Sequence, residues 1–183
     1  MLRIGRAPYR IGQLGRALVP WVPGRDRALA AALLSPTQLA AFLRMTPTDQ
    51  RHAVRVARAL MAEGWRDDDL LVAALLHDLG KIDPAGQGRV HLTHRVGKVI
   101  LARYAPHYWH QASDLPQRGH RYGYYLLAHH PEIGADWAAR LGVSPRACAL
   151  IAAHQGDGIA AALAQEVAFA RQLARLRAID DRS

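Results

Sequence analysis

The adjacent residues His77 and Asp78 are the part of this 183-residue chain that most suggests chemistry. They close an apolar run that predicts a buried helix over residues 70–79, and Gly80 marks its end. A carboxylate in such a place is costly unless it is paired or binds a metal. An imidazole beside a carboxylate suits Zn, Mn, Fe or a similar ion. Lys81 cannot bind a metal when it is protonated, but it can neutralise a substrate phosphate beside one.

Three further histidines occupy comparable positions. His52 lies on the expected interior side of a helix over residues 49–63, His130 precedes Pro131, and His154 ends the apolar run 150–153. A lone histidine at such a place is more typical of a core or of a helix cap. Taken together with His77 and Asp78, however, the three indicate a metal site.

The elements that must position these residues are helices. Half of the residues are apolar and only 7% are aromatic, and Ala and Leu, which favour helices, supply most of the apolar side chains. No stretch alternates apolar and polar residues in the way of a strand. The sequence therefore predicts an all-α fold. Helices are expected at 25–34, from Pro36 to about 43, and at 49–63, 70–79, 92–104, 122–129, 131–141, 145–154 and 158–178, with loops at 83–91 and 105–120.

The chain is long enough for one domain with a terminal extension. We expect residues 1–46 to form a helical N-terminal extension that packs on a core domain of residues 47–183. The single cysteine, Cys148, excludes an internal disulfide framework. No apolar run is long enough for a transmembrane helix, and the N-terminus lacks the features of a signal peptide, so we expect a cytoplasmic protein with no membrane partner.

The net charge of +9 favours an anionic partner, which could be a phosphorylated small molecule, a nucleic acid or an acidic surface. The basic residues are scattered, and no block of five or more like charges occurs. Nucleic-acid binding is therefore the weaker interpretation, and a soluble, Arg-rich helical surface explains the charge equally well.

At this point the sequence resembles a known family. His52, followed by the segment 77–81 (HDLGK), resembles the H…HDxGK signature of the HD domain superfamily of metal-dependent phosphohydrolases. The segment 130–134 (HPEIG) resembles that family's HPxxG motif, His154 its later histidine, and the segment 178–181 (AIDD) its closing Ala-Asp motif. The resemblance covers about residues 49–181.

The resemblance implies a role for each matched residue. The first metal would be bound by His52, His77, Asp78 and Asp180, and a second by His130 and His154, with Asp78 bridging the two. Asp78 and Lys81 would be the catalytic residues, with Lys81 contacting the substrate phosphate. Asp181 and Asp157 are the alternatives to Asp180. One or two divalent ions are implied, from among Mn, Mg, Fe, Ni, Co and Zn.

The activity that the resemblance implies is hydrolysis of a phosphoester bond, in a nucleotide or another small phosphorylated molecule, by metal-activated water. Gln155 follows His154, and no Gly-Tyr-Pro segment comes after it, which argues against the HD-GYP branch and its cyclic dinucleotide substrates. The alternative is a non-catalytic regulatory module that binds metal or nucleotide. The substrate and the oligomeric state stay open.

Six other histidines are expected at the surface, in loops or around the site, with His129 the nearest to it: His91, His94, His107, His110, His120 and His129. For one aromatic group, a nucleotide pocket and core packing are both open: Tyr104, Tyr108, Trp109, Tyr122, Tyr124 and Tyr125.

Overall fold

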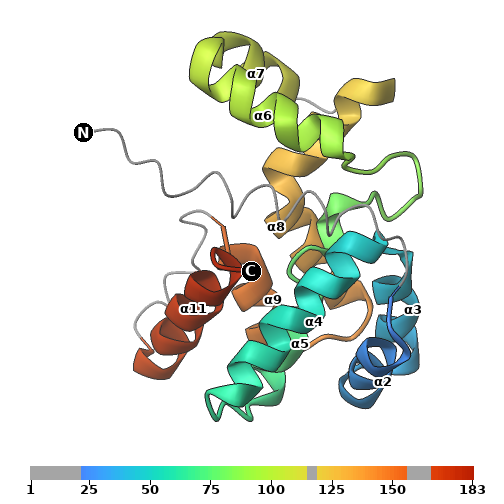
Figure 1. The fold of residues 1–183 in the computed structure, drawn as a ribbon, viewed down its shortest axis with the longest axis vertical. Helices are drawn as coiled ribbons and strands as arrows, with labels where there is room; N and C mark the ends of the chain where they lie inside the picture. Colours follow the sequence, from blue (N-terminus) through green and yellow to red (C-terminus); the bar gives the residue numbers. More distant parts are fainter. Residues whose placement is uncertain (1–21, 115–118, 156–165) are drawn as a thin grey trace.

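The computed structural model describes residues 22–114, 119–155 and 166–183, and the regular secondary structure in these ranges is helical apart from one isolated antiparallel bridge between Ile82 and Arg89 (Figure 1). The predicted all-α fold is confirmed. In chain order the elements are α2 (Gly24–Leu33), α3 (Pro36–Arg44), α4 (Pro47–Ala62), α5 (Asp68–Leu76), the 3₁₀ helix η2 (Leu79–Lys81), α6 (Leu92–Tyr104), α7 (Pro106–Ser113), the 3₁₀ helix η3 (Gly119–Arg121), α8 (Tyr122–Arg140), α9 (Pro145–Ala153) and α11 (Val167–Asp180).

Four of the helices begin at a side chain that accepts a hydrogen bond from the backbone N–H three residues further on. The N-cap residues are Ser35, Thr46, Asp67 and Ser144. At Ser35 the Gln38 side chain also accepts from the Ser35 N–H, which completes a capping box. These local signals fix where α3, α4, α5 and α9 start, and therefore where the residues that they carry lie.

The centre of the fold is α5, as its all-round apolar sequence predicts. Residues 70–80 are buried apart from the half-buried Val72. Around α5 pack α2, α4, α9 and α11, and α8 packs against both α9 and η2 (Figure 1). Because α5 is enclosed on all sides, the residues at its end are delivered into the interior of the protein.

The helices α2 and α3 contribute to the same core as the rest of the chain. Ala30, Leu34, Phe42 and Met45 are buried in one cluster with the side chains of α4 and α5. These two helices fall within the stretch expected as an N-terminal extension, whose first 21 residues lie outside the described ranges.

The structure corrects two predictions about the middle of the chain. The expected loop at 105–120 contains α7 and the start of η3. The helix α7 begins with Pro106 in its first turn, where the backbone N–H that proline lacks would have no partner within the helix. Pro131, expected to start a new helix, lies inside the continuous helix α8. The helix tolerates it because the carbonyl that loses its partner, that of Leu127, accepts a hydrogen bond from the His130 side chain instead.

Two helix ends also differ from the predictions. The helix expected over 70–79 ends at Leu76, and a turn and η2 follow. The last helix, expected over 158–178, is described from Val167 and continues to Asp180, so Asp180 lies in the helix and not after it. Among the described residues, no helix is long and apolar enough to cross a membrane.

Candidate metal centre

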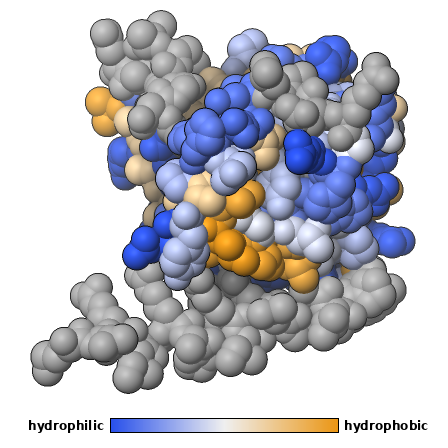
Figure 2. Space-filling view, turned by 90° about the horizontal axis from the view of Figure 1, so that it is seen from above, coloured by the Kyte–Doolittle hydropathy of each residue, from blue (hydrophilic) through white to orange (hydrophobic). Residues whose placement is uncertain are grey.

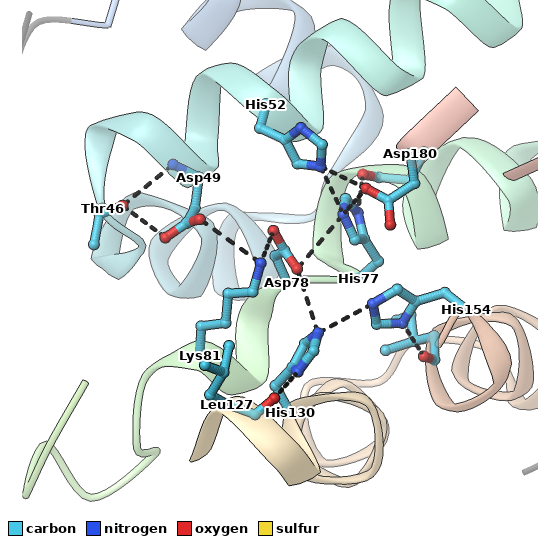
Figure 3. Close-up of polar contacts among 12 residues, drawn as sticks. Thr46, Asp49, His52, His77, Asp78, Lys81, Leu127, His130, His154 and Asp180 are labelled. Atoms are coloured by element: carbon cyan, nitrogen blue, oxygen red, sulfur yellow. Dashed lines mark hydrogen bonds and ion pairs between the residues drawn. The ribbon is translucent and has the colours of Figure 1, made fainter. Parts of the chain in front are cut away.

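Six side chains converge where α5 ends, and they are the six predicted as metal ligands (Figure 3). The structure brings them together from five parts of the chain: His52 from α4, His77 and Asp78 from the turn after α5, His130 from α8, His154 from the residue after α9, and Asp180 from the end of α11. All are buried except His52 and Asp180, whose side chains keep 17% and 11% of their surface exposed. Solvent therefore reaches the cluster from the side of α4 and α11.

One half of the cluster joins His52, His77 and Asp180. Asp180 Oδ1 lies 2.6 Å from Nε2 of His52 and 3.3 Å from Nε2 of His77, and the two imidazole nitrogens are 3.2 Å apart. Ligand atoms at about 2.1 Å from one ion lie roughly 3 Å from each other, so this spacing suits a shared ion.

The other half joins Asp78, His130 and His154. The Nε2 atoms of His130 and His154 are 3.2 Å apart. Asp78 Oδ1 lies 3.6 Å from Nε2 of His130 and also 3.6 Å from Nε2 of His77. This one oxygen therefore faces both halves of the cluster, which is the placement that a bridging carboxylate requires.

Three of the histidines are held in the same way. The Nδ1 atom of each lies within hydrogen-bond distance of the backbone carbonyl three residues earlier: His77 of Ala74 at 2.9 Å, His130 of Leu127 at 3.0 Å, and His154 of Ile151 at 2.6 Å. A carbonyl can only accept, so Nδ1 carries the proton in all three. The Nε2 atoms then point to the centre of the cluster.

Each of these carbonyls is available because its helix leaves it without the usual partner. Ala74 and Ile151 lie in the last turns of α5 and α9, where carbonyls lack the usual N–H four residues further on. The Ile151 carbonyl accepts only a long hydrogen bond, at 3.4 Å, from the backbone N–H of His154. Leu127 lies in the middle of α8, but residue i+4 is Pro131, which has no N–H. Two helix ends and one internal proline thus orient the three imidazoles.

The centre of the cluster is lined by hydrogen-bond acceptors. With Nδ1 protonated, neutral His130 and His154 present only lone pairs at Nε2, and these face each other without a proton between them. Asp78 Oδ1 is buried and has no hydrogen-bond partner among the described residues. Buried acceptors without a donor are costly, and a cation would satisfy all of them at once. The donor set of nitrogen and oxygen atoms fits a divalent transition metal.

The charges of the site hold its histidines in different states. Burial lowers the pKa of His77, but the neighbouring carboxylates of Asp78 and Asp180 outweigh it and raise the pKa to about 9. Burial and the charge of Lys81 hold the pKa of His130 well below its usual value, while burial and the charge of His77 lower that of His154 to about 4. In the metal-free protein, His77 therefore carries a proton that a metal ion would displace.

Both carboxylates of the cluster stay ionised. Burial acts to raise the pKa of Asp78, but the charge of Lys81, followed by that of His77, holds it well below its usual value. Burial likewise acts against ionisation of Asp180, and hydrogen bonds from His52 and His77 overcome it and lower the pKa of that carboxyl. The cluster therefore offers two negative charges to a cation.

A chain of charged groups runs from the cluster to α6. Lys81 Nζ lies 2.6 Å from Asp78 Oδ2 and 4.0 Å from Oδ1 of Asp49, which in turn accepts a hydrogen bond from Arg95 at 2.5 Å. The hydroxyl of Thr46 donates to the other oxygen of Asp49 at 2.6 Å. Lys81 is thereby held at the edge of the centre with its side chain 13% exposed.

Close packing of two glycines fixes η2 against α8. A Cβ atom on Gly80 would lie 2.1 Å from the carbonyl oxygen of His130 and 2.6 Å from the backbone nitrogen of Gly134. The backbone that follows Asp78 therefore touches the backbone that carries His130, and this contact sets the distance between the two halves of the cluster.

Asp49 and Arg95 were not anticipated as parts of the site. Asp49 stands three residues before His52 on α4, and that spacing, which puts two residues on one side of a helix, is a signal that could have found it. Nothing in the sequence marks Arg95. Of the alternatives for the last ligand, Asp181 is exposed beside Asp180, and Asp157 lies outside the described residues.

The expectation for His94 was wrong. It is buried, accepts a hydrogen bond from the backbone N–H of His91 at 2.8 Å, and donates one to the carbonyl of His120 at 2.7 Å. Gly123, which leaves no Cβ to meet the ring, makes room for it. With both nitrogens used, His94 fastens the start of α6 to η3.

The residues expected around the site lie apart from it. His129 donates to the carbonyl of Ser113 at 2.9 Å and so faces α7 instead of the metal-binding cluster. Of the aromatic group, Tyr104 and Tyr108 are 78% and 64% exposed and lie outside the core. Trp109 and Tyr122 pack against a small buried cluster, as core packing predicts.

Comparison with known families agrees with this geometry. The model of the HD domain family matches residues 50–181, which is more than half of the chain and includes all six residues of the cluster. No curated protein and no solved structure matches the chain.

Proposed function

The chain belongs to the HD domain family, and we propose that it is a metal-dependent phosphohydrolase that cleaves a phosphoester bond of a nucleotide or another small phosphorylated molecule. The observation that carries this proposal is the buried, unpartnered Oδ1 of Asp78, which lies between His77 and His130 and beside the ammonium of Lys81. This arrangement puts a place for a cation next to a donor for a phosphate oxygen.

Two sets of residues would hold the metal. His52, His77, Asp78 and Asp180 would bind a first ion, and Asp78, His130 and His154 a second. Imidazole ligands favour Mn, Fe, Co, Ni or Zn over Mg, which prefers oxygen ligands. When bound, such ions lower the pKa of water enough to supply a hydroxide nucleophile near neutral pH.

The protein groups around the metal would bind and orient the substrate. The ammonium of Lys81 has three N–H donors and donates one hydrogen bond to Asp78 Oδ2, so it can donate another to a phosphoryl oxygen. Asp49 and Arg95 keep Lys81 in place. The hydroxyl of Thr46 donates to Asp49 and accepts from the Asp49 N–H as the N-cap of α4, and water is the nucleophile in the proposal.

A panel of nucleotides and simple phosphoesters, each tested with Mn, Mg, Co, Ni, Fe and Zn, examines this proposal. We expect at least one substrate to be hydrolysed in a metal-dependent manner. Asp78→Asn should abolish the turnover, and Asp181→Asn, which changes an exposed carboxylate next to the cluster, should leave it intact. Activity that survives complete metal removal would contradict the proposal. Tight metal and nucleotide binding with no turnover across the panel would favour a regulatory module instead.

A further inference from the structure

The helix α6 turns its apolar side chains away from the protein. Of its 13 residues, only His94 is buried. Leu92, Val96, Val99 and Ile100 are each at least half exposed, at 52, 50, 60 and 53%. On a helix of 3.6 residues per turn, these four positions form one stripe along one side. A helix of a folded domain normally buries such a stripe, so its exposure marks a surface that binds something else.

The opposite side of α6, which faces the protein, is small or polar. His94 packs against Tyr124 and His120, and Gly97 leaves room for the Tyr124 side chain, whose hydroxyl would lie 2.2 Å from an added Cβ. Lys98 lies over the ring of Trp109 in α7. The packing of α6 on α7 and α8 therefore does not use the stripe, and no rearrangement of α6 is needed to expose it.

The stripe belongs to a projecting hairpin. Figure 1 shows α6 and α7 side by side at one end of the molecule, beyond the body formed by α4, α5 and α9. Figure 2, which views the molecule from that end, shows a patch of hydrophobic surface bordered by hydrophilic residues. The stripe continues at Tyr104, and Tyr108 of α7 is also largely exposed. The outward surface is thus a ridge of apolar and aromatic side chains.

The surroundings of the ridge are basic. The sequence from Pro84 to Ser113 contains no Asp or Glu. Of its four basic residues, Arg89 and Arg103 are exposed, whereas Arg95 pairs with Asp49 and Lys98 lies over Trp109 on the side that faces the protein. Arg103 follows Val96 and Val99 by seven and four residues, so it lies in the line of the stripe, and Arg89 is exposed just before α6. An apolar ridge with aromatic residues, basic neighbours and no acidic ones has the composition of a helix that lies in the interface of an anionic membrane.

We propose that the ridge formed by Leu92, Val96, Val99, Ile100 and Tyr104 docks the protein on the surface of a membrane rich in anionic lipids. The helix α6 lies parallel to that surface, with the apolar side chains of the stripe among the acyl chains and the long side chain of Arg103 extending from the stripe to the headgroups. A second copy of the chain fits the ridge less well, because pairing two ridges would bring Arg103 and Arg89 of both copies together without an acidic partner. A ridge also suits a fluid surface better than it suits the groove of a folded partner.

The inference goes beyond the proposed function and does not depend on it. It replaces the expectation of no membrane partner, which rested on the lack of an apolar run long enough to span a membrane. The test is co-sedimentation of the purified full chain with vesicles of phosphatidylcholine alone and of phosphatidylcholine mixed with phosphatidylglycerol. We expect binding to the mixed vesicles, little binding to the neutral ones, and weaker binding at high salt. The double variant Val99→Ser/Ile100→Ser should lower the partition coefficient at least about tenfold.

Two further variants make the result specific. Leu43→Ser changes a side chain that is 45% exposed on α3, away from the hairpin, and should leave vesicle binding unchanged. Arg103→Gln should weaken binding to the mixed vesicles severalfold and reduce its dependence on salt. Both changes replace exposed side chains, and circular dichroism checks that each variant keeps the helical content of the wild type.

Three results would overturn the inference. The first is no binding of the wild-type chain to the mixed vesicles. The second is binding that survives the Val99→Ser/Ile100→Ser change, which would assign the affinity to basic residues elsewhere in the chain. The third is a wild-type dimer, detected by sedimentation velocity, that the double variant dissociates, which would assign the ridge to a second copy.

Discussion

Replacing Pro131 by alanine should leave the stability of the protein nearly unchanged and make its metal binding weaker. Pro131 lies inside α8, where it removes the N–H that would bond to the carbonyl of Leu127. That carbonyl instead lies 3.0 Å from Nδ1 of His130. Alanine restores the backbone N–H, which then competes with the imidazole for the same acceptor.

The size of each effect follows from the surroundings of Pro131. A proline within a helix costs about 3 kcal/mol relative to alanine. Truncating its buried ring removes two methylene groups, which costs roughly 1.6 kcal/mol at about 0.8 kcal/mol each. The buried Nδ1–H of His130, when it loses the Leu127 carbonyl, costs about 1–3 kcal/mol, which offsets the remaining gain. The unfolding temperature should therefore change by no more than about 4 °C for a domain of this size. A weakened hydrogen bond behind a metal-binding histidine typically lowers metal affinity by about tenfold or more.

The assay pairs thermal unfolding of the metal-free variant with calorimetric titration of Mn²⁺. The control is Pro36→Ala, which changes an exposed proline in the first turn of α3, where no N–H is needed. It should leave the affinity for Mn²⁺ unchanged. A Pro131→Ala variant that binds Mn²⁺ as tightly as the wild type would refute the role given to the Leu127 carbonyl, and a large fall in unfolding temperature would refute the stability estimate.

Three other predictions follow from the same cluster. Lys81→Met should lower kcat/KM by roughly 100-fold, because the phosphate loses the ammonium donor beside the metal centre. Metal binding should not weaken, because Asp78 loses a competing cation. Calorimetry and kinetics together check this, and weaker metal binding would contradict it. In chelator, the unfolding midpoint should be highest near pH 6.5. His154, with its pKa lowered to about 4, contributes stability that is lost as the pH falls below 6.5 toward 4. His77, with its pKa raised to about 9, contributes stability that is lost as the pH rises from 6.5 through 9. An unfolding midpoint that climbs steadily from pH 6.5 to 9 would count against this assignment. In a denaturant titration, Gly80→Ala should lower the free energy of unfolding by about 3 kcal/mol, because the new Cβ meets the backbone of α8. The control Gly24→Ala, with no atom within 4 Å of its Cβ, should leave the free energy of unfolding unchanged.

The sequence was most informative where a local pattern decides the structure. The apolar run 70–76 has no polar face to turn to solvent, so its burial and the delivery of His77 and Asp78 into the interior could be predicted. The N-caps at Ser35 and Ser144 likewise fixed two helix starts, because their side chains bond within three residues.

Prediction from sequence was wrong where a contact, near or distant along the chain, overrides the usual preference of a residue. Proline usually ends a helix, but Pro131 does not end α8, because the His130 imidazole takes the place of the missing N–H. The histidines and aromatic residues of 105–114 have no clear helical period, yet they form α7 against α6 and α8. Asp49 and Arg95 meet across 46 residues of sequence, and no local pattern reveals such a pair.

The most direct test of the account is the metal content of the purified protein, measured by elemental analysis after saturation with Mn²⁺ and removal of free ions. The acceptor-lined cluster predicts one or two ions per chain in the wild type. It predicts none in Asp78→Asn, in which an amide replaces the carboxylate that faces both halves, and an unchanged content in Asp181→Asn. A wild-type chain that retains no divalent ion, or an Asp78→Asn chain that retains the full complement, would contradict the account.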